Sequence, residues 1–216
     1  MTFRLFARIA VLTACGLSFA SAPAGAAPVI SELFYDASGS DAGLTFVELY
    51  GAPGESLDGL VLEGVNGSNG SVYTSFALSG VIPGDGVFVI GDDDGSGSTA
   101  VTDADLVGPV DYQNGPDSVV LRDSVSIVDA VGYGSFAATD IFAGEGDAAP
   151  DPAAGGSIAR IYPALDTNNN SADFSALAVP TPGSVPVISS VPLPAGIQLF
   201  ASGLVGLVSV ARRRRH

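Results

Sequence analysis

The residues best placed to do chemistry form an acidic loop at positions 92–103. Counted from Asp92, acids stand at positions 1, 3 and 12, a serine at position 5 and a glycine at position 6. Oxygen-bearing side chains at this spacing are typical of calcium-binding loops, in which the glycine permits a sharp turn. The sequence therefore predicts Asp92, Asp94, Ser96 and Asp103 as candidate calcium ligands. The alternative interpretation is a solvated acidic loop, since position 12 is an aspartate rather than the longer glutamate.

Composition excludes most catalytic chemistry. Cys15 is the one cysteine and His216 the one histidine, and both lie in terminal segments that we expect to be removed. Without cysteine, histidine or lysine, the mature chain has no disulfide framework, zinc site, Ser-His-Asp triad or Ser-Lys pair. Carboxylate pairs are left, but acids are too abundant here for a pair to be informative. We therefore expect no enzyme, and no cofactor apart from calcium.

Two glutamates, Glu32 and Glu48, lie within stretches of otherwise apolar residues. One interpretation is a carboxylate pair for binding or catalysis. The other is structural: each glutamate occupies an outward-facing strand position, or is satisfied by an arginine or by backbone donors. Because alternation along a strand places acids on its wet face, we favour the structural interpretation.

Charge is distributed very unevenly along the chain. All 23 acidic residues lie between Glu32 and Asp173, and the basic residues in that region are Arg122 and Arg160. Proteins bind nucleic acid by neutralising phosphates with lysine and arginine, so we expect no nucleic-acid partner. Such a surface attracts divalent cations instead.

The first 26 residues have the features of a secretory signal peptide. Arg4 and Arg8 form a positive start, residues 9–20 an apolar core, and Ala24-Gly25-Ala26 a small-residue cleavage site for signal peptidase. The alternative is a lipoprotein signal, because Leu12-Thr13-Ala14-Cys15 resembles the motif that precedes lipid attachment.

The C-terminal segment combines three features in order. Val191-Pro192-Leu193-Pro194-Ala195 precedes an apolar stretch over residues 195–211 and a basic end over residues 212–216. As a helix the apolar stretch spans about 25 Å, somewhat less than the ~30 Å hydrocarbon core of a bilayer. Arginines mark the cytoplasmic end of a membrane helix, so we expect the acidic domain to face outward.

This order resembles the PEP-CTERM class of exosortase sorting signals, in its VPLPA variant. The resemblance implies that a membrane-embedded exosortase cuts near the Pro-Leu-Pro-Ala motif and releases the domain or passes it to another anchor. Residues 185–194 are then a linker and the start of the sorting motif, residues 195–211 a transmembrane helix and residues 212–216 a cytoplasmic polybasic end. The alternative is a simple membrane anchor that is never cut.

Between these ends, apolar residues come in short runs separated by glycine, proline and asparagine turns. The pattern predicts about eight antiparallel strands and an all-β, immunoglobulin-like sandwich over residues 27–184. The expected strands are residues 29–35, 44–50, 57–64, 71–78, 86–91, 117–122, 126–133 and 157–162. We expect residues 140–156 to form a mobile loop and residues 166–173 an Asx-turn structure that closes the sandwich.

The ordered short motifs of this region resemble the lamin-tail domain family. The blocks that carry the resemblance are Ile30-Ser31-Glu32-Leu33-Phe34-Tyr35-Asp36, Phe46-Val47-Glu48-Leu49-Tyr50, Leu57-Asp58-Gly59-Leu60-Val61-Leu62, Pro83-Gly84-Asp85-Gly86-Val87-Phe88-Val89-Ile90, Asp117-Ser118-Val119-Val120-Leu121-Arg122-Asp123, Val128-Asp129-Ala130-Val131-Gly132-Tyr133-Gly134, Gly156-Ser157-Ile158-Ala159-Arg160, Asp166-Thr167-Asn168-Asn169-Asn170-Ser171-Ala172-Asp173-Phe174 and Pro180-Thr181-Pro182-Gly183. The resemblance implies an immunoglobulin-fold module on an exported protein. Ser31 and Leu60 replace the family's usual asparagine and aromatic residue, so no ligand is carried over.

These features predict a non-enzymatic exported protein of the cell surface or extracellular matrix, anchored in the membrane until it is processed. The expected partners are signal peptidase and exosortase during export, and extracellular polysaccharide or surface proteins afterwards. The alternative function is a calcium-dependent binding or adhesion module that uses the acidic loop.

Overall fold

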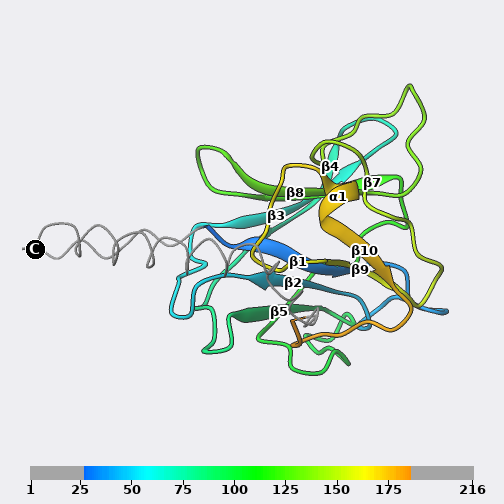
Figure 1. The fold of residues 1–216 in the computed structure, drawn as a ribbon. Helices are drawn as coiled ribbons and strands as arrows, with labels where there is room; N and C mark the ends of the chain where they lie inside the picture. The colour runs from blue at the N-terminus through cyan, green and yellow to red at the C-terminus, as the bar shows by residue number, and fades with distance from the viewer. Residues whose placement is uncertain (1–26, 186–216) are drawn as a thin grey trace, which may run out of the picture.

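A computed structural model describes residues 27–185 of the protein. The predicted signal peptide, most of the linker, the transmembrane helix and the polybasic end lie outside the described residues. The described chain forms two β-sheets and one short helix, so the expectation of an all-β fold is confirmed (Figure 1).

The two sheets differ in size. The large sheet has six strands in the order β10-β9-β1-β2-β5-β6, and the small sheet has four in the order β4-β3-β7-β8. The strands are β1 (Val29–Phe34), β2 (Phe46–Tyr50), β3 (Val61–Asn66), β4 (Val72–Ala77), β5 (Val87–Asp92), β6 (Leu106–Gly108), β7 (Asp117–Arg122), β8 (Ile127–Tyr133), β9 (Ser157–Arg160) and β10 (Phe174–Leu177).

The core lies between the sheets because apolar side chains alternate along each strand. On β2, Val47 and Leu49 point into the main hydrophobic cluster, which includes residues of both sheets. Phe46 points the opposite way, into a second cluster on the outer face of the large sheet. Alternate side chains of β2 therefore pack in two apolar layers, one on each face of the large sheet.

The structure corrects several expectations. All eight expected strands are present, with ends that shift by up to four residues, but β6 and β10 are additional strands. β6 pairs with β5 in parallel, whereas we expected antiparallel strands throughout. Residues 140–156 are held by backbone hydrogen bonds, whereas we expected a mobile loop. The Ile141 N–H donates to the Gly67 carbonyl, and the Ala149 N–H donates to the Gly132 carbonyl.

The segment predicted as an Asx-turn structure contains a short helix, α1 (Asn170–Asp173), and closes one edge of the small sheet. The Asn169 side chain caps this helix by accepting from the backbone N–H groups of Ser171 and Ala172. The buried Asn170 donates from Nδ2 to the Ala130 carbonyl at 2.8 Å and accepts at Oδ1 from the Gly132 N–H at 2.9 Å. Its amide thus pairs with backbone groups of the edge strand β8, which removes an open site for strand pairing.

Candidate functional site

The acidic loop at positions 92–103 begins where β5 ends. Asp92 is buried, and its Oδ2 accepts from the Gly43 N–H at 2.8 Å. Asp94 is exposed, and its Oδ1 accepts from the backbone N–H and the hydroxyl of Ser96 at 2.8 and 2.6 Å. These hydrogen bonds from Ser96 lower the pKa of the Asp94 carboxyl. Asp94 is therefore engaged within its own turn, whereas Asp92 is bonded to a distant loop.

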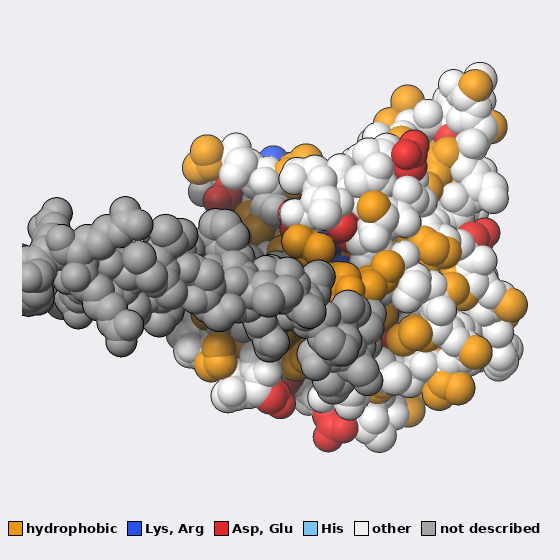
Figure 2. Space-filling view, viewed as in Figure 1, with side chains coloured by type: hydrophobic (Ala, Val, Ile, Leu, Met, Phe, Trp, Pro, Cys, Tyr) orange, Lys and Arg blue, Asp and Glu red, His pale blue; other side chains and the backbone are white. Residues whose placement is uncertain are grey.

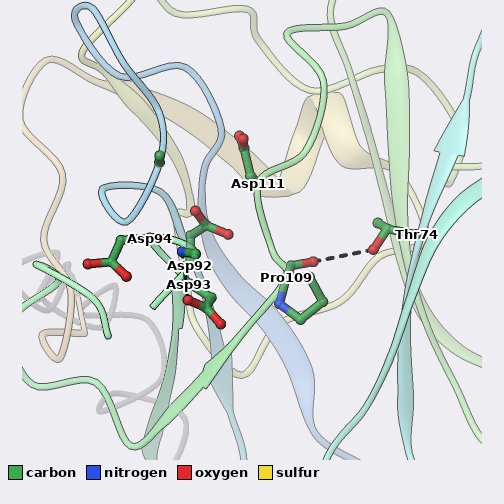
Figure 3. Close-up of a pocket in the computed structure, with 8 residues that line it drawn as sticks. Thr74, Asp92, Asp93, Asp94, Pro109 and Asp111 are labelled. Atoms are coloured by element: carbon green, nitrogen blue, oxygen red, sulfur yellow. Dashed lines mark hydrogen bonds between the residues drawn. The ribbon is translucent and has the colours of Figure 1, made fainter. Parts of the chain in front are cut away.

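The structure does not gather the four predicted calcium ligands around one point. Figure 3 shows the carboxylate of Asp94 turned away from those of Asp92 and Asp93. Asp103 has a left-handed backbone (φ 60°) and lies beside Gly183, whereas Ser96 points at Asp94. In the described residues, Asp92, Asp94 and Asp103 do not form a group of three carboxylates within 4.8 Å of one another. Calcium binding by this loop therefore stays a prediction.

A hollow of about 470 Å³ lies beside this loop (Figure 3). Asp92, Asp93 and Asp94 line one side of it, and Asp111 and Thr74 line the other. Burial raises the pKa of Asp111, and the charges of Asp92 and Asp41 add to the rise. The hollow is a strongly negative concavity, and its lining includes no basic residue.

Arg160 is the largest fully buried side chain in the described chain. It extends from β9 into the space between the sheets, where Nη2 donates to both oxygens of Asp129 on β8 at 2.8 and 2.9 Å. Nη1 donates to Asp173 at 3.2 Å, and Nε donates to the Ile30 carbonyl at 2.8 Å. The guanidinium also lies 4.8 Å from the centre of the Phe174 ring. One arginine thus joins the large sheet to the small one.

Three carboxylates beside Arg160 lie within 4.8 Å of one another: Asp129, Glu145 and Asp166. Burial, followed by the charges of Asp129 and Asp166, raises the pKa of Glu145 to about 7. Arg160 already supplies positive charge here, with Nη1 3.6 Å from Asp166 Oδ1. Glu145 Oε2 is buried without a hydrogen-bond partner in the described chain, so the arrangement favours a proton on Glu145.

A pair of buried glutamates lies on the outer face of the large sheet. Glu32 on β1 and Glu48 on β2 are register partners, and both side chains are 0% exposed. Glu32 accepts from the hydroxyl of Ser157 at 2.6 Å, and Glu48 accepts from the hydroxyl of Ser31 at 2.7 Å. The prediction that both glutamates face outward is confirmed, but they are not wet.

A segment from far along the chain covers this pair. Residues 179–185, which we call the strap, run back over the large sheet after β10, as the orange trace in Figure 1 shows. Thr181 donates to Glu32 from its backbone N–H and its hydroxyl at 2.9 and 2.6 Å. Gly183 donates from its N–H to Glu48 at 2.9 Å, in a left-handed turn (φ 74°) that favours glycine. The strap ends at Val185, which packs on the outer apolar cluster.

Placing Glu32 and Glu48 side by side costs free energy when both carboxylates are charged. A proton retained on Glu48 reduces this cost. Burial raises the pKa of Glu48 to about 7 against the hydrogen bonds from Ser31 and Gly183, and the Glu32 charge adds to the rise. Two facing carboxylates without a nearby cation cannot both ionise cheaply. The pair is therefore a protonation-sensitive attachment point for the strap.

The sequence indicates Glu32 and Glu48 as a pair in one interpretation, but it predicts neither their burial nor the cluster around Arg160. The carboxylate partners of Arg160 are 13 and 31 residues distant from it in the chain. Thr181 is 149 residues from Glu32, so no local pattern predicts that the strap covers the glutamates. One usable signal existed: Arg160 lies within an apolar strand in a region that has few other basic residues.

The predicted processing residues lie outside the described residues. These are Ala24, Ala26, Val191, Pro192, Leu193, Pro194 and Ala195. Within residues 27–185, no helix has the length and apolar character needed to cross a membrane. Comparisons of the chain with protein-family models, curated proteins and solved structures gave no match.

Proposed function

We propose that the chain is a non-enzymatic exported module that presents an acidic, immunoglobulin-like domain of lamin-tail type at the cell surface. In this account signal peptidase removes residues 1–26, and an exosortase processes the chain at the Pro192–Ala195 motif. The presented domain then contacts extracellular polysaccharide or surface proteins.

The observation that carries this proposal is how the domain ends. The strap attaches the C-terminal end of the domain to the middle of the large sheet through Glu32 and Glu48. The described chain therefore ends on the outer face of the large sheet at Val185, six residues before Val191. Such an exit suits a domain that is held on a tether and presented to the outside.

The placement of the buried carboxylates supports a non-enzymatic role. Asp129 and Asp173 are bound to Arg160, and Glu32 and Glu48 are bound to the strap. A carboxylate pair in a glycosidase must instead face an open cleft that admits substrate and water. Calcium-dependent binding through the Asp92–Asp103 loop stays the alternative function.

Surface exposure in the native host tests this proposal. Intact cells that express the full chain are treated with protease, and the acidic domain is followed by immunoblot. We expect the domain to be cleaved from outside. A variant with Pro192→Ala and Pro194→Ala should accumulate in the membrane fraction, whereas the matched control Asp94→Asn should behave like the parent. A domain that stays protected in intact cells would contradict the proposal.

A further inference from the structure

The strap has few attachments to the rest of the domain. Its polar contacts to the sheet are the hydrogen bonds from Thr181 and Gly183 to the two glutamates, and its main apolar contact is Val185. Val179, at its start, is 72% exposed. Pro180 and Pro182 line a hollow beside Phe34 and Phe46. In the described chain, the acidic pair therefore accepts every hydrogen bond that joins the strap to the sheet.

The charges around this pair all have the same sign. On the strap side, Asp103 lies beside Gly183, and Asp85 and Asp105 line the same hollow. Neither of the described basic residues faces the pair. Arg160 points between the sheets, and Arg122 pairs with Glu63 in the small sheet. Where Figure 2 shows described residues, it shows scattered acidic side chains and very little basic surface.

Consequently, no cation among the described residues lies near Glu32 and Glu48 to balance the charge of a second ionised carboxylate. Glu32 accepts three hydrogen bonds, one from Ser157 and two from Thr181. Glu48 accepts two, from Ser31 and Gly183, and is the partner placed to hold a proton. Both side chains are fully buried with the strap seated.

We propose that the strap is a releasable latch: Glu32 and Glu48 hold it while they share one proton, and repulsion between two ionised glutamates frees it. Release exposes both carboxylates to water. Burial then no longer disfavours their charged forms. It also extends the free tether back to the end of β10. Residues 178–185 then add about 25 Å of extended chain between the domain and whatever holds its C-terminal end.

The direction of the pH dependence follows from the raised pKa of Glu48. A group whose pKa is higher in the seated state favours that state at low pH and loses this contribution as pH rises through about 7. The strap is therefore seated at pH 6 and weakened at pH 8.5. Taking the ordinary glutamate pKa for the released state, the seated-to-released ratio falls on the order of tenfold between these pH values.

Amide hydrogen exchange of the full chain tests the latch directly, because the Thr181 and Gly183 amides donate to the glutamates. After correction for the intrinsic effect of pH on exchange, we expect these amides to lose about tenfold protection between pH 6 and pH 8.5. Core amides of β5 serve as the internal reference. In Glu48→Gln, which keeps an acceptor for Gly183 but cannot ionise, the loss should disappear. The matched control Glu63→Gln should behave like the parent.

A second variant keeps the latch testable if Glu48→Gln fails to fold. Thr181→Val removes the hydroxyl bond to Glu32 and should lower strap protection at both pH values. Equal protection of the parent strap at pH 6 and pH 8.5 would overturn the latch, and so would an unchanged pH response in Glu48→Gln. The latch is independent of the proposed surface role, because exchange is measured in the purified chain and surface exposure in cells.

Discussion

At the scale of single residues, the fold depends on a few buried charges that are paired across the two sheets. Arg160 satisfies Asp129 and Asp173 at once, so removing it leaves two carboxylates without a cation. Breaking a buried ion pair costs far more free energy than the intact pair contributes, because the remaining charge is uncompensated. Exposed pairs contribute little by comparison.

Arg160→Ala should therefore lower the free energy of unfolding by about 3–5 kcal/mol. The matched control is Arg122→Ala, which breaks a partly exposed pair with Glu63 at 3.4 Å and should cost about 1 kcal/mol or less. Urea unfolding followed by circular dichroism measures both variants. Equal losses in the two variants would show that Arg160 does not join the sheets.

At the scale of elements, the alternation of apolar and polar residues and the turn residues between them predict most of the strands. Contacts between segments distant in sequence determine the rest of the fold. All eight expected strands exist because their apolar faces are strongly patterned. β6 is three residues long, too short for an alternating pattern to show, and the four-residue β10 was not predicted either. The strap could not be predicted either, since its position depends on glutamates about 135–149 residues away.

The edge closure by Asn170 gives an element-scale prediction. Asn170→Ala should lower the free energy of unfolding by about 3 kcal/mol, because buried backbone groups of β8 lose their partners. Asn169→Ala, which removes only the cap of α1, should cost about 1 kcal/mol. Denaturant titration compares the two. A larger loss from Asn169→Ala would contradict the role of Asn170 in closing the sheet edge.

The acidic loop is also tested as an element. Because Asp92, Asp94 and Asp103 do not form one group in the described residues, we expect calcium and magnesium at equal ionic strength to raise the melting temperature equally. Saturating a real calcium site a hundredfold above its Kd would add about 2.7 kcal/mol. A rise specific to calcium that is lost in the variant Asp92→Asn with Asp94→Asn would support the alternative, calcium-binding function.

At the scale of the whole molecule, 23 acids against few bases make stability dependent on pH. Folding raises the pKa of Glu48 and of Glu145 to about 7. Each therefore contributes stability that is complete below the ordinary glutamate pKa and is lost as pH rises through about 7. The domain should melt at a higher temperature at pH 5.5 than at pH 8.5 when ionic strength is constant.

The variant Glu145→Gln tests how much Glu145 contributes to the pH dependence of the melting temperature. The variant should lose less melting temperature between pH 5.5 and pH 8.5 than the parent, because the amide cannot ionise beside Asp129 and Asp166. Glu63→Gln is the control, since its exposed partner Arg122 lies in the small sheet. Identical pH profiles for the parent and Glu145→Gln would contradict the assignment.

We propose that the mature protein is this one domain, exported and processed at both ends. Intact-mass spectrometry of the protein purified from its native host tests this proposal most directly. We expect a chain that begins at Ala27 and lacks Arg212-Arg213-Arg214-Arg215-His216. A mass that retains the arginine end on most molecules would contradict sorting and identify a permanent membrane anchor instead.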